Sequence, residues 1–349
     1  MRYTLLACIS LCPALVGQLR TLPTGYQARP GEYSTGGGVT YPFGRSVNFA
    51  YQEVHSSWNG TTQAPLTAIG FRRAPRRVAN ATALAHTVDA TVTMGPGSLP
   101  GFTNTFATNF TGTATVTMAT RTVNMPDWTQ PFVPEYLFSI WMPLDAPYVV
   151  DTTQDFVWDL LLMNSTLPNV GSSLYYSDRT STTSATGFVL GTGCTATGLA
   201  SPVSLTTSLT NNTTTGLMGI TFSGSNFPAS VPGVLHLGLT NLNLPFPGLC
   251  GTVHASPDVA IPIGPTSATG ALTSTSITFP FQASLLNAYF YTQALAPDAG
   301  QAGLPLVLSN AREGGFPPGS TFKYIYSLTP PSLTGSGPFT AGSVISAYQ

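Results

Sequence analysis

Polar and apolar residues alternate along many short stretches of this chain. Thr and Val alternate with small or polar residues over 87–94, 112–118 and 203–209. A period of two with β-branched residues, bounded by Gly, Pro and Asn, is typical of half-buried strands. The run 156–164 also predicts a strand. The pattern therefore predicts an all-β protein.

Breaks in this pattern leave little room for long helices. The chain contains 35 Gly and 30 Pro residues, both of which interrupt helices. Two stretches, 282–289 and 292–298, could form short helices, and both also fit a strand and a loop. We expect helix in less than about a tenth of the residues.

The charged residues are distributed unevenly, which suggests two domains. Beyond residue 180 they are Asp258, Asp298, Arg312, Glu313 and Lys323. The Ser-, Thr- and Gly-rich stretch 177–187 is typical of a linker or a long surface loop. We predict two β-sandwich or jelly-roll-like domains in tandem, 18–180 and 190–349, each long enough for its own core.

The first 17 residues have the pattern of a secretory signal peptide. Arg2 supplies the positive start, 5–16 the short apolar core, and Gly17 a small residue before the cleavage point. A lipoprotein signal at Cys8 or Cys12 is a poorer alternative, because the preceding residues match a lipobox only loosely. No later stretch is long and apolar enough for a membrane-spanning helix. We expect a secreted or cell-envelope protein.

Low charge narrows the range of functions. The chain has 12 Lys and Arg and 13 Asp and Glu among 349 residues, whereas soluble domains have about a quarter of their residues charged. The net charge of −1 argues against nucleic-acid binding, which needs many basic side chains at phosphates. Low charge also removes repulsion between surfaces, which favours cell-envelope polymers, glycans or copies of the chain as partners. We expect no cofactor.

Two cysteines remain once the signal peptide is removed. Cys194 and Cys250 both follow glycine-rich segments, which allow the Cα separation of about 5.5–6 Å that a disulfide needs. In an oxidising compartment an isolated pair most simply forms one bridge. We predict that the two are joined.

The second half contains four short motifs: 191–194 (GTGC), 247–250 (PGLC), 291–294 (YTQA) and 303–311 (GLPLVLSNA). With these motifs, 191–311 resembles a module of uncharacterised secreted or envelope proteins from planctomycete-type bacteria. The order Pro297-Asp298 and the additional Leu249 depart from that pattern. A weaker likeness links 41–73 to an N-terminal β-sandwich of such proteins. Both imply a secreted all-β protein and no particular activity.

One basic run is a candidate binding site. It contains Arg72, Arg73, Arg76 and Arg77. Guanidinium groups match sulfate, phosphate and carboxylate geometry, so the run could bind an anionic glycan. The alternative is a turn after the strand ending at Phe71, with Pro75 at its corner.

The densest acidic segment contains Asp151, Asp155 and Asp159. A carboxylate pair can hydrolyse glycosides, but two residues four apart on a strand lie about 13 Å from each other, too far for that role. Asp151 and Asp155 are alternatively weak candidates for binding calcium through a loop.

Two tryptophans are candidates for stacking on sugar rings. Trp58 and Trp128 are flanked by Asn59-Gly60 and Asp127, which favours exposed loops. The alternative is that they fill the core, as aromatic residues commonly do. The preferred hypothesis is a non-catalytic extracellular protein with a structural, adhesive or surface-display role. The rivals are a carbohydrate-binding module using these tryptophans and a secreted hydrolase using Asp151–Asp159.

Overall fold

The computed structural model describes most of the chain beyond the predicted signal peptide, which lies outside the described residues. The described residues are 19–23, 25–27, 29, 31, 41–44, 48–56, 65–74, 83–130, 137–168, 175–181, 184–212, 215–318 and 322–349. They form antiparallel sheets with two short 3-10 helices, so the all-β prediction is confirmed. The described part of the chain contains no helix that is long and apolar enough to cross a membrane.

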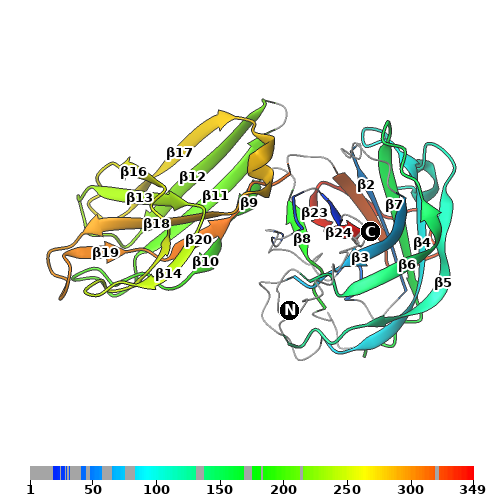
Figure 1. The fold of residues 1–349 in the computed structure, drawn as a ribbon, viewed down its shortest axis with the longest axis horizontal. Helices are drawn as coiled ribbons and strands as arrows, with labels where there is room; N and C mark the ends of the chain where they lie inside the picture. Colours follow the sequence, from blue (N-terminus) through cyan, green and yellow to red (C-terminus); the bar gives the residue numbers. More distant parts are fainter. Residues whose placement is uncertain are drawn as a thin grey trace, which may run out of the picture.

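The first sandwich contains the strands at both ends of the described chain (Figure 1). One sheet has the order β22-β21-β2-β7-β4-β5, and the facing sheet has the order β1-β24-β3-β6; β8 and β23 form a separate pair. The bounds are β1 Arg20–Leu22, β2 Phe49–His55, β3 Leu66–Phe71, β4 His86–Gly97, η2 Phe106–Asn109, β5 Thr115–Met125, β6 Ile140–Tyr148, β7 Asp155–Met163, β8 Arg179–Ser181, β21 Phe322–Ser327, β22 Ser336–Phe339, β23 Ala341–Val344 and β24 Ser346–Tyr348.

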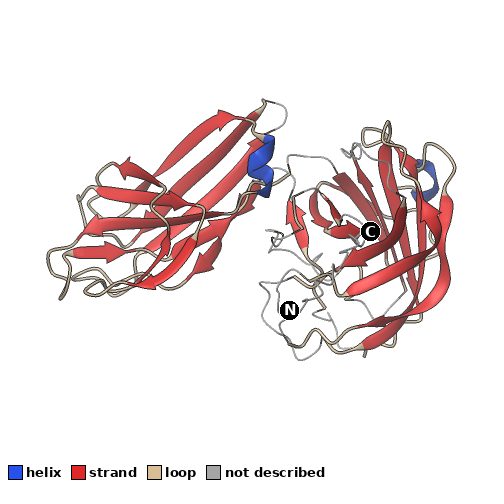
Figure 2. Cartoon of the chain, in the orientation of Figure 1, coloured by secondary structure: helices blue, strands red, loops and turns tan. Residues whose placement is uncertain are grey.

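The second sandwich is formed by the intervening segment (Figure 1), and Figure 2 shows that it too consists mainly of strands. One sheet has the order β10-β20-β18-β13-β16 with β19 paired to β18, the other has the order β17-β12-β11-β9, and β14 and β15 form a hairpin. The bounds are β9 Ser184–Thr186, β10 Phe188–Leu190, β11 Ser204–Asn212, β12 Leu217–Ser225, β13 Gly233–Gly238, β14 Asn241–Pro245, β15 Thr252–Ala255, β16 Val259–Ile263, β17 Leu272–Pro280, η3 Ala283–Asn287, β18 Phe290–Pro297, β19 Leu306–Leu308 and β20 Ala311–Gly314.

Each sandwich has its own hydrophobic core. Strand β4 alternates buried and half-buried residues, as its sequence pattern predicts, and contributes Val88, Ala90 and Val92 to the first core. Strand β11 alternates likewise and contributes Leu205 and Leu209 to the second. Both cores draw on two facing sheets, because one sheet can bury only one side of each strand.

Strand pairing differs from the expected division into 18–180 and 190–349. Strand β21 pairs with β2, from Ala50↔Ser327 to His55↔Phe322, and β24 lies between β1 and β3. Residues 322–349, expected in the second domain, therefore complete the first sandwich. The sequence contains no signal for this return, because β21 and β24 pair with residues more than 250 positions away.

Two local expectations also change. The stretch 177–187, expected to be a linker or surface loop, contains strands β8 and β9, and Asp178, Arg179 and Thr180 are buried. Of the two candidate helices, 282–289 contains the short η3, whereas 292–298 lies within strand β18 except for its last residue. In β18 the tertiary pairing with β13 outweighs local helix propensity.

Candidate functional site

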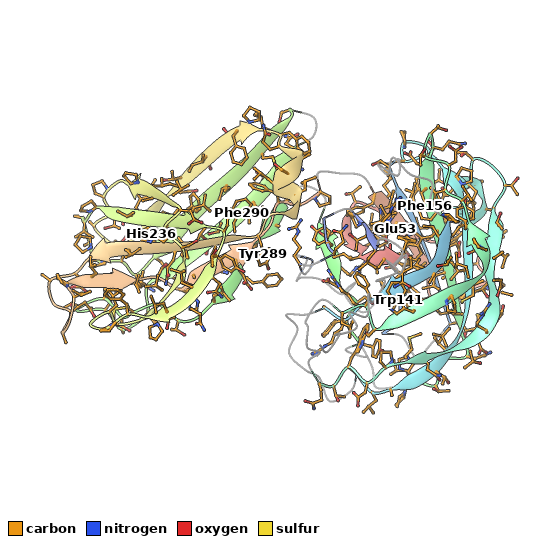
Figure 3. All side chains as sticks on the ribbon, viewed as in Figure 1. Glu53, Trp141, Phe156, His236, Tyr289 and Phe290 are labelled. Carbon is orange, nitrogen blue, oxygen red and sulfur yellow. A yellow bond between two sulfur atoms is a disulfide. The ribbon has the colours of Figure 1, made fainter. Side chains whose placement is uncertain are left out.

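The first sandwich uses several of its scarce charged residues inside the core. Glu53 accepts hydrogen bonds from the Tyr51 hydroxyl at 2.8 Å and from the backbone N–H of Val344 at 3.3 Å, and its other oxygen lies 3.1 Å from His55 Nε2. Burial, followed by the negative charge of Glu53, raises the pKa of the Tyr51 hydroxyl. Figure 3 shows Glu53 among the strands of this sandwich, and its side chain is fully buried. This cluster links β2 to β23, and its carboxylate is shielded from solvent.

The predicted basic binding run is wrong where the structure describes it. Arg72 is buried; its Nε donates to Asp178 Oδ2 at 2.7 Å, and its guanidinium lies 4.6 Å from the centre of the Phe138 ring. Arg73 is also buried and donates through Nη1 to the Gln130 carbonyl. Arg76 and Arg77 lie outside the described residues. A buried guanidinium must be paired, and these two therefore serve the fold rather than an external anion.

The tryptophan prediction is wrong for Trp128, and Trp58 lies outside the described residues. Trp128 is fully buried and stacks on Tyr175 with 3.9 Å between ring centroids. Its Nε1 donates to the Ser139 hydroxyl at 3.1 Å, which satisfies the indole N–H inside the core. The alternative interpretation, that Trp128 fills the core, is therefore the one the structure supports.

The carboxylates of the acidic segment have separate partners within the protein. Asp151 accepts hydrogen bonds from the backbone and hydroxyl of Thr153 and from Gln154 Nε2, so both its oxygens serve its own turn. Asp155 accepts from the Leu99 N–H at 2.6 Å. No group of three acidic, histidine or cysteine residues suited to a metal occurs in the described part of the chain.

Asp159 lies on the same strand as Asp155, as predicted, but has different surroundings. Its Oδ2 accepts a hydrogen bond from Gln52 Nε2 at 3.2 Å, and Gln52 in turn accepts from Asn109 Nδ2 at 2.7 Å. Burial raises the pKa of the Asp159 carboxyl to about 7, and the Gln52 hydrogen bond lowers it by less. Asp159 therefore belongs to a network that fastens the 103–109 segment to the sheet.

The predicted disulfide is present. Cys194 and Cys250 are bonded, with a Cα–Cα distance of 5.5 Å, within the expected range. Cys194 is buried, and its backbone N–H donates to the Leu308 carbonyl. The bridge therefore ties the loop after β14 to the edge of the second core.

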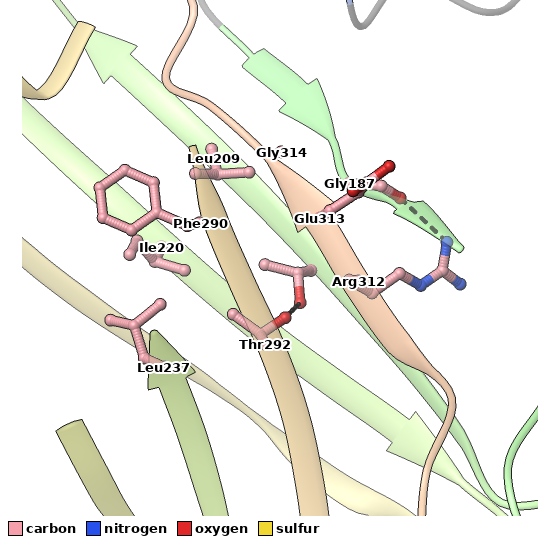
Figure 4. A pocket seen from close by; sticks show the side chains of 10 residues that line it. Gly187, Leu209, Ile220, Leu237, Phe290, Thr292, Arg312, Glu313 and Gly314 are labelled. Atoms are coloured by element: carbon pink, nitrogen blue, oxygen red, sulfur yellow. Dashed lines mark hydrogen bonds between the residues drawn. The ribbon is translucent and has the colours of Figure 1, made fainter. Parts of the chain in front are cut away.

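The space between the two sheets of the second sandwich is packed. Figure 4 shows Leu209, Ile220, Leu237 and Phe290 around it, together with the hydrogen bond from Arg312 to the Gly187 carbonyl. The gap between these side chains is too narrow for a water molecule. A small-molecule ligand therefore has no room here.

The outer side of the β17-β12-β11-β9 sheet is lined by hydroxyl groups. Strand register places them opposite one another: Thr206 faces Ser223, Ser208 faces both Thr186 and Thr221, and Thr221 faces Ser276. We call this surface the hydroxyl face; its members are Ser184, Thr186, Ser204, Thr206, Ser208, Thr210, Thr221, Ser223, Ser225, Ser276 and Thr278. All are half-buried or exposed, whereas Leu205, Leu209 and Phe222 between them point into the core.

Cross-strand hydrogen bonds join parts of the hydroxyl face. The Ser204 and Ser225 hydroxyls lie 2.9 Å apart, and those of Thr221 and Ser276 lie 2.8 Å apart. None of the residues in these four strands is charged. With strands about 4.8 Å apart and about 3.3 Å per residue, the face spans roughly 14 Å by 25 Å.

Apolar side chains border the hydroxyl face at one end. Leu217 faces Pro280 across β12 and β17, and both are exposed. The adjoining Phe281 is 41% exposed, and its N–H donates to the Gly216 carbonyl at 2.8 Å. The sequence pattern predicts a strand over 203–209 but not the surface to which it belongs. The alternation of Ser204, Thr206 and Ser208 is the signal that points to the hydroxyl face.

Comparisons with known proteins add no family. No protein-family model matches the chain. A search of curated proteins gave no significant match.

Proposed function

We propose that this chain is a non-catalytic extracellular protein that adheres to a neutral, hydroxyl-rich polymer such as a polysaccharide. The observation that carries the proposal is the uncharged hydroxyl face with the exposed Phe281 at its end. It retains the expected structural or adhesive role and the sugar chemistry of the carbohydrate-binding alternative, with a different set of residues.

The chemistry of the face suits such a polymer. A hydroxyl group is both donor and acceptor, so Ser and Thr can exchange hydrogen bonds with sugar hydroxyls in either direction. An uncharged face also avoids the cost of removing ions from water. Leu217, Pro280 and Phe281 offer the apolar contact that the C–H side of a sugar ring needs.

The expected affinity of one face is low. Each hydrogen bond contributes only about 0.5–1.5 kcal/mol net because it replaces one to water. Many copies on one polymer gain through effective concentration, which can raise avidity by roughly 10²–10⁴. Low affinity of each face combined with high avidity suits adhesion to an insoluble or repetitive polymer better than capture of a free sugar.

Co-sedimentation with insoluble neutral polysaccharides tests the proposal. We expect the protein to bind, and the triple variant Thr221→Val, Ser276→Ala, Phe281→Ala to lose binding. The matched control is Thr91→Val with Thr120→Val, which removes a similar hydroxyl pair, 2.7 Å apart, from β4 and β5 of the first sandwich. Equal loss in the control would contradict the role of the hydroxyl face. Release of soluble reducing sugars by the wild type would instead support the hydrolase.

A further inference from the structure

Two chain segments connect the two sandwiches, and the described part of the second is fully buried. This part, Gly315 to Pro318, follows β20 of the second sandwich and leads toward β21 of the first; we call it the strap. An exposed, extended linker would leave its carbonyls to water. In this strap two successive carbonyls are bound by side chains, one from each sandwich.

The N-terminal part of the chain binds the strap through Arg29. Its Nη2 donates to the Phe316 carbonyl at 2.6 Å, and its Nε donates to the Gly25 carbonyl at 2.9 Å. The guanidinium also lies 4.2 Å from the centre of the Tyr26 ring. Arg29 is only 3% exposed, so these charge-assisted bonds are largely shielded from competing water.

Arg29 is itself fixed to the first sandwich. Its carbonyl accepts a hydrogen bond from Arg72 Nη2, and Arg72 pairs with Asp178 at 2.7 Å. Asp178 also accepts from the Gly31 N–H at 2.9 Å, and its carbonyl accepts from the Ile345 N–H. Asp178, just before β8, therefore anchors the segment that carries Arg29, and Ile345, just before β24, holds Asp178 in place.

The second sandwich grips the strap from the other side. Asn211 Nδ2 donates to the Pro317 carbonyl at 3.1 Å. The Phe316 ring packs edge-on against Phe290 and Phe279, with centroids 5.3 Å and 5.6 Å away. A Cβ atom at Gly315 would lie 1.9 Å from Arg29 Nη1 and 2.9 Å from the Ala288 carbonyl, so the strap is enclosed between both sandwiches.

We propose that Arg29, Asn211 and the strap form a clamp that fixes the orientation of the second sandwich relative to the first. Without it, two sandwiches joined by two chain segments would be free to reorient, as domains with small interfaces generally are. The clamp makes them move as one body. This inference stands apart from the proposed function, because none of its residues belongs to the hydroxyl face.

Pulsed electron spin resonance on the full mature chain tests the clamp. Spin labels go on two exposed alanines, Ala107→Cys in the first sandwich and Ala229→Cys in the second. We expect one narrow distance distribution for the wild type and a broad one for Arg29→Ala. Hydrogen exchange at Gly315 and Phe316 should also quicken by about tenfold or more, from the loss of charge-assisted hydrogen bonds to the strap.

Arg121→Ala is the matched control, because it removes a half-exposed arginine paired with Asp145 on β6, outside the clamp. It should leave both readouts unchanged. If Arg29→Ala fails to fold, Arg29→Lys decides, since lysine keeps the charge but cannot bind both carbonyls through a planar fork. A distribution as narrow as that of the wild type in the folded Arg29 variant, with unchanged exchange in the strap, overturns the proposal.

Discussion

Removing residues 318–349 should unfold the first sandwich and leave the second intact. The deletion takes away β21 to β24 and the residue between β23 and β24. This segment supplies buried Phe322, Ile325, Val344, Ile345 and Tyr348. At roughly 1.5–3 kcal/mol for each large side chain, these five contribute about 7–15 kcal/mol. The stability of a whole domain is typically about 5–15 kcal/mol, so the remaining strands cannot compensate.

Circular dichroism and denaturant unfolding measure this outcome on three chains. The chain of residues 18–317 should keep only the unfolding transition of the second sandwich. Residues 184–318 alone should fold, since they hold the second core. Residues 18–181 joined to 318–349 by a flexible linker of about ten residues should recover the first transition. A truncated chain that keeps both transitions would refute the reasoning, because the first sandwich would then be stable without β21 and β24.

Three further predictions concern single sites. The Cys194→Ser, Cys250→Ser double variant should lose about 4 kcal/mol of stability in the second sandwich, the chain-entropy value for a loop of this length, measured by urea unfolding; no shift in the midpoint would contradict it. The pKa of Asp159 is raised to about 7 in the folded state. The resulting contribution of its protonated form to the free energy of unfolding is therefore fully present below about pH 4 and is lost as the pH rises to 7. Asp159→Asn should therefore remove up to about 4 kcal/mol of the pH dependence of the unfolding free energy, measured by urea unfolding at several pH values. If the variant and the wild type show the same pH dependence, Asp159 does not cause it. Trp128→Ala should destabilise the first sandwich by roughly 3–5 kcal/mol in a thermal melt, whereas an unchanged melting temperature would place the indole outside the core.

Local patterns predicted these strands because the alternation of buried and exposed residues is set by neighbouring positions in the sequence. The alternation in 87–94 and 203–209 identified β4 and β11, and the glycines before Cys194 and Cys250 were compatible with the bridge. The return of β21 to pair with β2 could not be predicted in this way. It depends on packing between segments that no local pattern connects.

The predictions that Trp128 and Arg72 bind a ligand at the surface were wrong for a related reason. Trp128 and Arg72 stand beside polar or turn-forming residues, which favours exposure, yet the core supplies Ser139 and Asp178 as partners. The hydroxyl face arises only when β9, β11, β12 and β17 align in register. Neither a buried partner nor a surface built from four strands is visible in a single stretch of sequence.

The insertion of one sandwich into another also sets the order in which the chain can fold during synthesis. The second sandwich contains all its own strands within 184–314, so it can form as soon as that segment emerges. The first must keep β2 and β3 unpaired on one edge until β21 and β24 arrive, after the entire second sandwich. Contacts so distant in sequence form slowly, and open strand edges are prone to aggregate. Through that delay the early strands therefore remain open to pairing with other chains.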